Sequence, residues 1–353
     1  MRSGKLLEFR YYVIRRILMQ IIVIWGMLSV SFFMMKAVPG DPVLLLVGEE
    51  AYSMIGGEAS VTKYVEEIRH YWKLDRPIWE QYVHYVGNVL QGKLGRSILT
   101  NRDIIRELRT RFPATVELAV FGFLIAMAIA IPSGIISALH RGGKVDQIAR
   151  IYSIFGVSAP NFWWGLLLLY IFYYTLRLPG LGFGRLSYGL KPPPFVTGMY
   201  TLDSLLAGRF DLFYNALSHL ALPALAIGIT SCGLTTRLTR SSLLEVLHKE
   251  YILTARMKGL KERIVIFRHA LRNSLIPVVT YVGYMFGGML GGSFLIETIF
   301  NYNGMGLLGL NAFLAKDFPA VLGIGVFSAI IFTTGNLIVD LLYGFIDPRV
   351  RYG

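Results

Sequence analysis

Residues Leu118–Leu139 read LAVFGFLIAMAIAIPSGIISAL, and no Asp, Glu, Lys or Arg interrupts them. A helix rises about 1.5 Å per residue, so a run of this length crosses the roughly 30 Å apolar core of a bilayer. A strand of a membrane barrel would instead alternate apolar and polar residues over about 10 positions. The run is continuously apolar and therefore predicts a transmembrane helix.

Five further runs share this freedom from charge: Ile17–Met35, Ile151–Leu176, Leu212–Thr236, Asn273–Ile296 and Phe318–Val339. The 353 residues are 54% hydrophobic and 16% charged, which is more apolar material than a single soluble core needs. We therefore expect an all-α integral membrane protein with six transmembrane helices. The first run is followed by no small-residue cleavage pattern, so we expect a retained helix rather than a signal peptide.

Basic residues predict the orientation, because short cytoplasmic loops retain Lys and Arg. More than half of the basic residues fall in the N-terminal segment, the 140–150 loop, the 237–272 loop and the C-terminal tail. Both termini are expected to face the cytoplasm. We attribute the formal net charge of +13 to this topology first and to attraction for anionic membrane lipid second, and not to nucleic-acid binding.

These observations divide the chain into four parts. Residues 1–36 form the cytoplasmic N-terminus and the first transmembrane helix, and residues 37–116, whose acids and bases nearly balance, form a small exterior domain between helices 1 and 2. Residues 117–346 form the remaining five helices and include the basic cytoplasmic loop 237–274. Residues 347–353 form a cytoplasmic tail.

The sequence shows no recognisable arrangement of catalytic residues. The six His residues are dispersed, and no pair stands four residues apart beside a Glu, as a zinc protease helix requires. No Gly-rich turn ends in Gly-Lys-Ser or Gly-Lys-Thr, so the chain does not hold ATP phosphates by that route. Cys232 is the only cysteine, which excludes an intrachain disulfide. We predict no catalytic, cofactor or metal site in this chain.

Two groups of residues near or inside the spans require an interpretation. Three carboxylates lie at the ends of spans, where we expect lipid headgroups to solvate them: Glu117, Glu297 and Asp340. An ionisable residue inside a membrane is often functional, so a functional role is the other interpretation. The prolines inside spans are interpreted as packing kinks. They are Pro132, Pro160 and Pro223.

Residues Glu250–Pro277, EYILTARMKGLKERIVIFRHALRNSLIP, form a basic amphipathic stretch between two apolar runs. Tyr251, Ala255 and Gly259 recur every four residues and so share one helical face. Gly259 tolerates the left-handed backbone that ends a helix. Periodicity alone leaves two partners open, a soluble protein that grips the helix or anionic lipid headgroups on which it lies.

Six short motifs resemble one known family over the whole chain: Phe32-Phe33, Pro39–Pro42, Leu94–Ser97, Arg111–Leu118, Ala159–Trp164 and Asp347–Tyr352. The family is the first membrane subunit of the oligopeptide/dipeptide class of ATP-binding-cassette importers, found in the prokaryotic cell membrane. Glu250–Pro277 is similar to the family's cytoplasmic loop, whose short helix sits in a groove of the ATPase subunit.

This resemblance implies the site and the partners. Ala255 and Gly259 match the family's loop, and their neighbours join them in an ATPase-coupling site: Thr254, Ala255, Arg256, Lys258, Gly259 and Leu260. Two ATPase subunits would carry ATP and Mg, a second related permease subunit would complete the pathway, and an extracytoplasmic solute-binding protein would deliver cargo.

The function implied is a permease subunit that forms half of the translocation pathway, without enzymatic activity of its own. Oligopeptides or dipeptides are the expected cargo, with oligosaccharides or nickel chelates as alternatives within the same class. An ion channel and an intramembrane enzyme are more remote alternatives. The sequence identifies no residue that lines the pathway.

Overall fold

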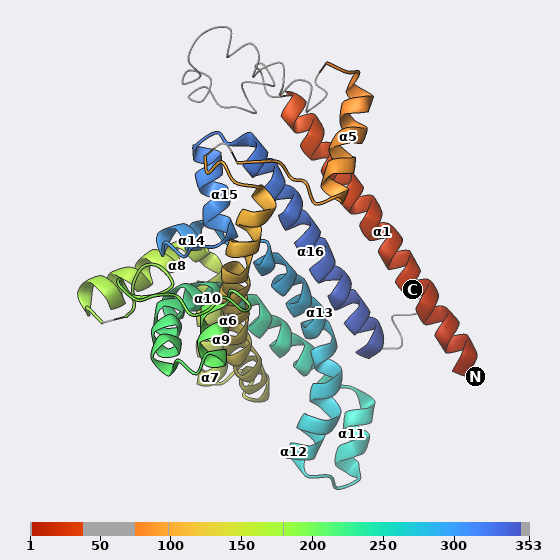
Figure 1. The fold of residues 1–353 in the computed structure, drawn as a ribbon. Coiled ribbons are helices and arrows are strands. Elements are labelled where there is room, and N and C mark those ends of the chain that lie inside the picture. The colour runs from red at the N-terminus through yellow and green to blue at the C-terminus, as the bar shows by residue number, and fades with distance from the viewer. Residues whose placement is uncertain (1, 38–74, 98, 179, 347–353) are drawn as a thin grey trace, which may run out of the picture.

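The computed structural model describes residues 2–37, 75–97, 99–178 and 180–346, and every named element within them is a helix (Figure 1). Slightly less than half of the expected exterior domain (residues 38–74 and 98) and the whole C-terminal tail lie outside the described residues. Helix α5 (Ile78–Leu90) and the first part of the helix Ile104–Leu139 fall within that expected domain.

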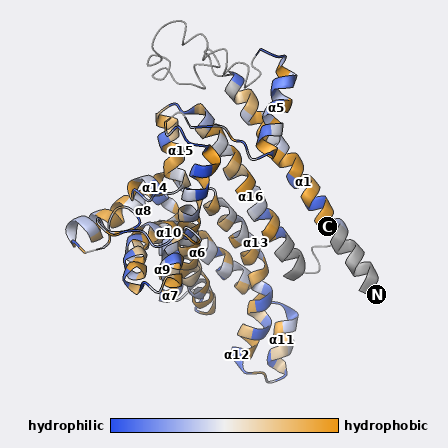
Figure 2. Ribbon diagram, in the orientation of Figure 1, coloured by the Kyte–Doolittle hydropathy of each residue, from blue (hydrophilic) through white to orange (hydrophobic). Residues whose placement is uncertain are grey.

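Four long helices form the frame of the molecule: α1 (Arg2–Ala37), α6 (Ile104–Leu139), α10 (Phe210–Leu247) and α16 (Phe318–Ile346). Among the described residues these four are long and apolar enough to cross a membrane. The expectation of a helical integral membrane protein is therefore confirmed. Hydrophobic residues run along α1, many of them exposed, as a lipid-facing helix requires (Figure 2).

The third expected span is broken, which corrects the interpretation of Pro160 as a kink in one rod. Helix α7 (Lys144–Ser158) and helix α8 (Asn161–Leu168), continued by the π-helix η1 (Leu169–Thr175), are bent by 102°. A proline disfavours the helical backbone of the residue before it, and Ala159 is extended, with φ −102° and ψ 137°. This bent pair would count as a fifth candidate span.

The fifth expected span is also interrupted. Helix α13 (Leu271–Leu290) is followed by a glycine turn, and α14 (Phe294–Ile299) begins after it. Gly292 has φ +95°, a left-handed backbone that a residue with a Cβ rarely adopts. The described residues thus give four or five candidate spans, and the six crossings that the apolar runs predict stay a prediction.

Four of the shorter helices lie at the two ends of the bundle (Figure 1). Helices α5 and α15 (Met305–Leu314) lie at one end. Helices α11 (Glu250–Met257) and α12 (Glu262–Ile264) lie at the other, where the π-helix η2 (Val265–Ala270) leads back into α13. Helix α6 runs without a break through residue 116, where the exterior domain is expected to end, and the domain limits stay a prediction.

Helix α10 packs against α6 on one side and against α7 on another, and glycines permit the close approach. A Cβ at Gly228 would lie 2.6 Å from a methyl carbon of Ile125 on α6. A Cβ at Gly233 would collide with the backbone carbonyl oxygen of Ser153 on α7. The three helices therefore form a tightly packed core.

Replacing Gly233 by Ala should lower the stability of the protein, because the new methyl group meets backbone rather than a movable side chain. Overpacking of this kind costs about 1–3 kcal/mol. The matched control is Gly325→Ala in α16, where a Cβ meets nothing within 4 Å. Thermal unfolding of both variants in detergent checks this, and equal melting temperatures would contradict the packing described.

Candidate functional site

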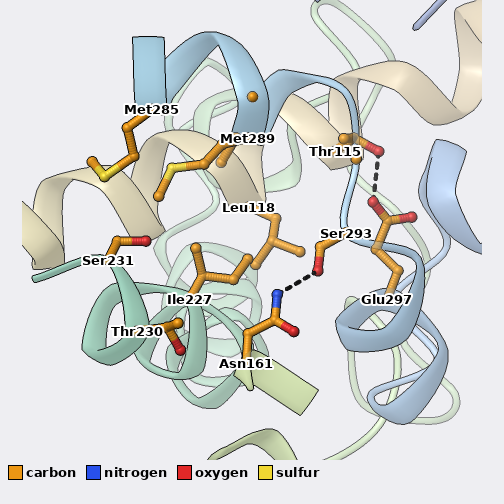
Figure 3. Close-up of a pocket in the computed structure, with 13 residues that line it drawn as sticks. Thr115, Leu118, Asn161, Ile227, Thr230, Ser231, Met285, Met289, Ser293 and Glu297 are labelled. Atoms are coloured by element: carbon orange, nitrogen blue, oxygen red, sulfur yellow. Dashed lines mark hydrogen bonds between the residues drawn. The ribbon is translucent and has the colours of Figure 1, made fainter. Parts of the chain in front are cut away.

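A cavity of about 260 Å³ lies inside the bundle, between α6, α8, α10, α13 and α14 (Figure 3). One part of its wall is apolar and includes Leu118, Ile227, Met285 and Met289. The polar side chains of the wall come from five separate places in the sequence. They are Thr115, Asn161, Thr230, Ser231, Ser293 and Glu297.

Asn161 and Ser293 meet at the cavity wall (Figure 3). The Asn161 amide Nδ2 lies 3.3 Å from the Ser293 Oγ. Asn161 is the first residue after the bend at Ala159–Pro160, and Ser293 follows the glycine turn after α13. The two interruptions of the expected spans thus place a neutral amide and a hydroxyl together on the cavity.

Glu297 is 0% exposed, and its carboxylate caps the start of α15. It accepts hydrogen bonds from the Thr115 hydroxyl at 3.0 Å and from the Leu307 backbone N–H at 2.9 Å. Thr115 accepts in turn from the Met305 backbone N–H at 2.8 Å. The first N–H groups of a helix lack partners within the helix and favour an anion. Headgroup solvation is therefore the wrong interpretation of Glu297.

Glu117 is 2% exposed and is satisfied by the protein as well. Its carboxylate accepts from Arg185 Nη2 at 2.7 Å, from the Tyr302 hydroxyl at 2.8 Å, and from both the backbone N–H and the hydroxyl of Thr201 at 2.7 Å. Arg185 also lies 3.5 Å over the Tyr200 ring. This cluster ties α6 to the loop before helix α9 (Tyr200–Leu206) and to the turn before α15, so headgroup solvation is wrong here too.

Asp340 is a third carboxylate for which an ion pair replaces the expected headgroup solvation. Its Oδ2 lies 2.9 Å from Arg16 Nη1, and its Oδ1 accepts from the Tyr284 hydroxyl at 3.2 Å. These contacts join α1 and α13 to α16. The side chain is largely buried between the helices.

The residues expected to couple to an ATPase lie at the opposite end of the molecule from α15 (Figure 1). Helix α11 ends at Met257, and Gly259 follows with φ +73°, as a helix-ending glycine should. The Arg256 guanidinium holds the Glu262 carboxylate at 2.6 Å and keeps the pKa of that carboxyl below its usual value. This ion pair links α11 to α12.

The sequence predicts one face of α11 for the ATPase contact, and the structure buries part of that face. Ala255 is 7% exposed, and with Ile252 it packs against Leu243 of α10 and Val265 of η2. The other five expected residues are exposed: Thr254, Arg256, Lys258, Gly259 and Leu260. The most exposed apolar side chain of the helix is Met257, at 72%. Ala255 therefore anchors α11 to its own chain, while the coupling role of the set stays a prediction.

The long apolar helices define a helical integral membrane protein, with a cavity between its helices. Residues 130–352 match the family described as binding-protein-dependent transport system inner membrane component, and residues 9–119 match the N-terminal model of that kind of component. The chain belongs to this family. It is a transport component of the inner membrane and not an enzyme, which confirms the resemblance seen in the sequence.

Individual relatives are similar over nearly the whole chain. The probable D,D-dipeptide transport system permease protein DdpB of Escherichia coli K12 is 43% identical over 334 residues, which are 94% of this chain and 95% of the relative. The di/tripeptide transport system permease protein DppB of Pseudomonas aeruginosa is 37% identical, over 97% and 98% of the two chains. The oligopeptide transport system permease protein AppB of Bacillus subtilis is 36% identical, over 97% and 99%.

Sequence reasoning found Glu117 and Glu297 but missed their partners. Arg185 lies 68 positions and Tyr302 185 positions from Glu117, so no local pattern connects them. For Asn161, the signal was the proline before it, which predicts a local change of direction but not the cavity that the change creates.

Glu117→Gln should destabilise the protein by about 3–5 kcal/mol, because it leaves the buried Arg185 without its counter-charge. The double variant Glu117→Gln, Arg185→Met removes the uncompensated charge and should recover most of the loss. Denaturant titration in mixed micelles measures both.

The matched control is Asp211→Asn. Asp211 pairs with Arg209 at 2.6 Å, but both side chains are exposed, so little stability should be lost. A loss in this control as large as that of Glu117→Gln would show that burial of the Glu117 pair is not the cause.

Proposed function

We propose that this chain forms half of the translocation pathway of an ATP-driven importer in a prokaryotic cell membrane. A second related permease subunit supplies the other half, two ATPase subunits bind ATP and Mg, and a solute-binding protein delivers cargo at the exterior face. Membership of the binding-protein-dependent family supports these partners.

Six crossings with both termini in the cytoplasm follow from the same proposal. Helix α13, 20 residues long, joins the four long helices and the bent α7–α8 pair as the sixth crossing. The basic 237–274 loop then lies on the cytoplasmic side together with the N-terminus, as the distribution of Lys and Arg favours.

One observation carries the proposal for coupling: α11 is fixed to the bundle on one face and presents apolar side chains on the other. Ile252 and Ala255 are buried against α10 and η2. Leu253 and Met257, four residues apart, are exposed on the outward side, and Leu260 follows them. An exposed apolar face on a short, anchored helix suits a groove in a soluble partner.

In this arrangement the ATPase grips the outward face, and Thr254, Arg256, Lys258 and Gly259 surround the contact. Closure of the ATPases on nucleotide displaces α11, and the bundle changes the side to which its cavity opens. A ligand shifts such an equilibrium only by its difference in affinity for the two states, so ATP must favour one arrangement.

Short peptides are the proposed cargo, since D,D-dipeptides, di/tripeptides and oligopeptides appear in the names of similar permeases. The neutral amide and hydroxyl groups of Asn161 and Ser293 on the cavity suit the hydrogen-bonding groups of a peptide main chain. Oligosaccharides and nickel chelates remain the alternatives. Competition against uptake of a labelled dipeptide by unlabelled members of each class distinguishes them.

Met257→Asp should abolish most peptide uptake while the protein still inserts, because a carboxylate would be desolvated in the apolar contact. Gly259→Pro should do the same, because proline fixes φ near −65° where the helix end needs +73°. Uptake of labelled dipeptide and co-purification of the ATPases measure both effects.

Arg141→Asp is the matched control, because it adds an acidic group to the other short basic turn, where Arg141 is also exposed. Uptake in this variant should stay near that of the unchanged protein. Normal uptake with both Met257→Asp and Gly259→Pro would count against docking at α11.

A further inference from the structure

Asp146 is a buried charge that the proposed function does not yet use. It is 1% exposed, and its carboxylate is paired in bidentate fashion with Arg240, Oδ1 with Nε at 2.7 Å and Oδ2 with Nη2 at 2.9 Å. It also accepts from the Ser137 hydroxyl at 2.6 Å and from the Gly142 backbone N–H at 2.9 Å. One carboxylate thus joins α6, the turn after it, α7 and α10.

The pair lies beside the segment that carries α11. Helix α10 continues from Arg240 to Leu247, and α11 begins at Glu250. Ala138, the neighbour of Ser137 on α6, belongs to the same buried cluster as Leu243 of α10 and Ala255 of α11. The inward face of α11 and the ion pair are therefore both held by α6 and α10, within one turn of each other on each helix.

From the ion pair, α7 follows α10 towards the cavity. The Gly233 backbone meets the Ser153 carbonyl, and a Cβ at Gly156 would lie 2.8 Å from the Ile229 carbonyl oxygen. Backbones in such close contact cannot slide past one another without separating. After α7 the chain bends at Pro160, and Asn161 reaches the cavity.

We propose that Asp146 and Arg240 are positioning residues that transmit displacement of α11 through α10 to α7, and so to the bend before Asn161. The inference rests on the proposed function, because it presupposes that a partner moves α11. Hydrophobic contacts alone have no direction, whereas a bidentate guanidinium–carboxylate pair fixes both the distance and the angle between two helices.

The chain of contacts ends at the cavity wall. When α7 rotates with α10, the bend moves with α7, and Asn161 therefore changes its position relative to Ser293. Ser293 stays in place because it belongs to the α13–α14 turn. Separation of this pair opens the cavity wall between α8 and the α13–α14 turn. The route connects the exposed end of α11 to the cavity through contacts that are all present in the structure.

Asp146→Asn in the complete transporter, reconstituted in proteoliposomes, tests the inference. ATP hydrolysis and uptake of a labelled dipeptide are measured on the same vesicles. We expect ATP hydrolysis within about twofold of the unchanged transporter but at least about fivefold more ATP consumed per peptide imported, the lower end of usual coupling effects. Arg240→Lys keeps the charge but loses the fork geometry, so an intermediate ratio is expected.

A distance measurement gives a second result that does not depend on uptake. Spin labels at Leu166 on α8 and Leu295 on α14, both exposed, report the distance between the helix that carries Asn161 and the helix that follows Ser293. They are introduced in a Cys232→Ser background, since Cys232 is the native cysteine. Nucleotide should change the distance in the unchanged transporter and leave it constant in Asp146→Asn.

The outcomes separate the two proposals. If abundance, ATP hydrolysis and uptake of Asp146→Asn fall together at a constant ratio, the pair is structural only and the inference is overturned. If Asp146→Asn does not assemble, Arg240→Lys decides by the same ratio. If the unchanged transporter binds no ATPase, the proposed function fails, and this inference fails with it.

Discussion

The structure depends on one constraint: a carboxylate inside an apolar bundle must find its donors within the protein. Desolvation of an unpaired charge costs more than most single contacts return. Glu117, Glu297 and Asp146 meet the constraint with donors from segments far apart in the sequence. Each carboxylate therefore fixes the position of several helices at once, in a membrane protein where apolar surface supplies little preference between neighbours.

The buried carboxylates lie in two separate parts of the molecule. At one end, Glu117 and Glu297 hold α6, the loop before α9 and the start of α15 as a unit. At the other, Asp146 joins α6, α7 and α10 beside the cluster that anchors α11. The cavity lies between the two ends, and the elements that meet on it at Asn161 and Ser293 both follow a break in the helical chain.

The apolar runs were enough to predict a helical membrane protein, because length and freedom from charge are local properties of a chain. The breaks were harder to predict, since a proline such as Pro160 permits either a kink or a sharp bend, and packing decides between them. For α11, Gly259 correctly marked the end of the helix. Periodicity could not tell which face meets the protein itself, so Ala255 was expected outside and lies inside. No local sequence pattern predicted the ion pairs Glu117–Arg185 and Asp146–Arg240, whose members lie far apart in the sequence.

The two faces of α11 are under different structural constraints. Ile252 and Ala255 are buried against the chain that carries them, whereas Leu253 and Met257 are mostly exposed and lie outside that buried cluster. Substitutions on the outer side can therefore accumulate at little cost to assembly of the subunit. If α11 is the ATPase contact, as proposed, a transporter built this way can exchange one ATPase for another over evolutionary time through changes at a few surface positions, and an engineer can retarget it by the same route.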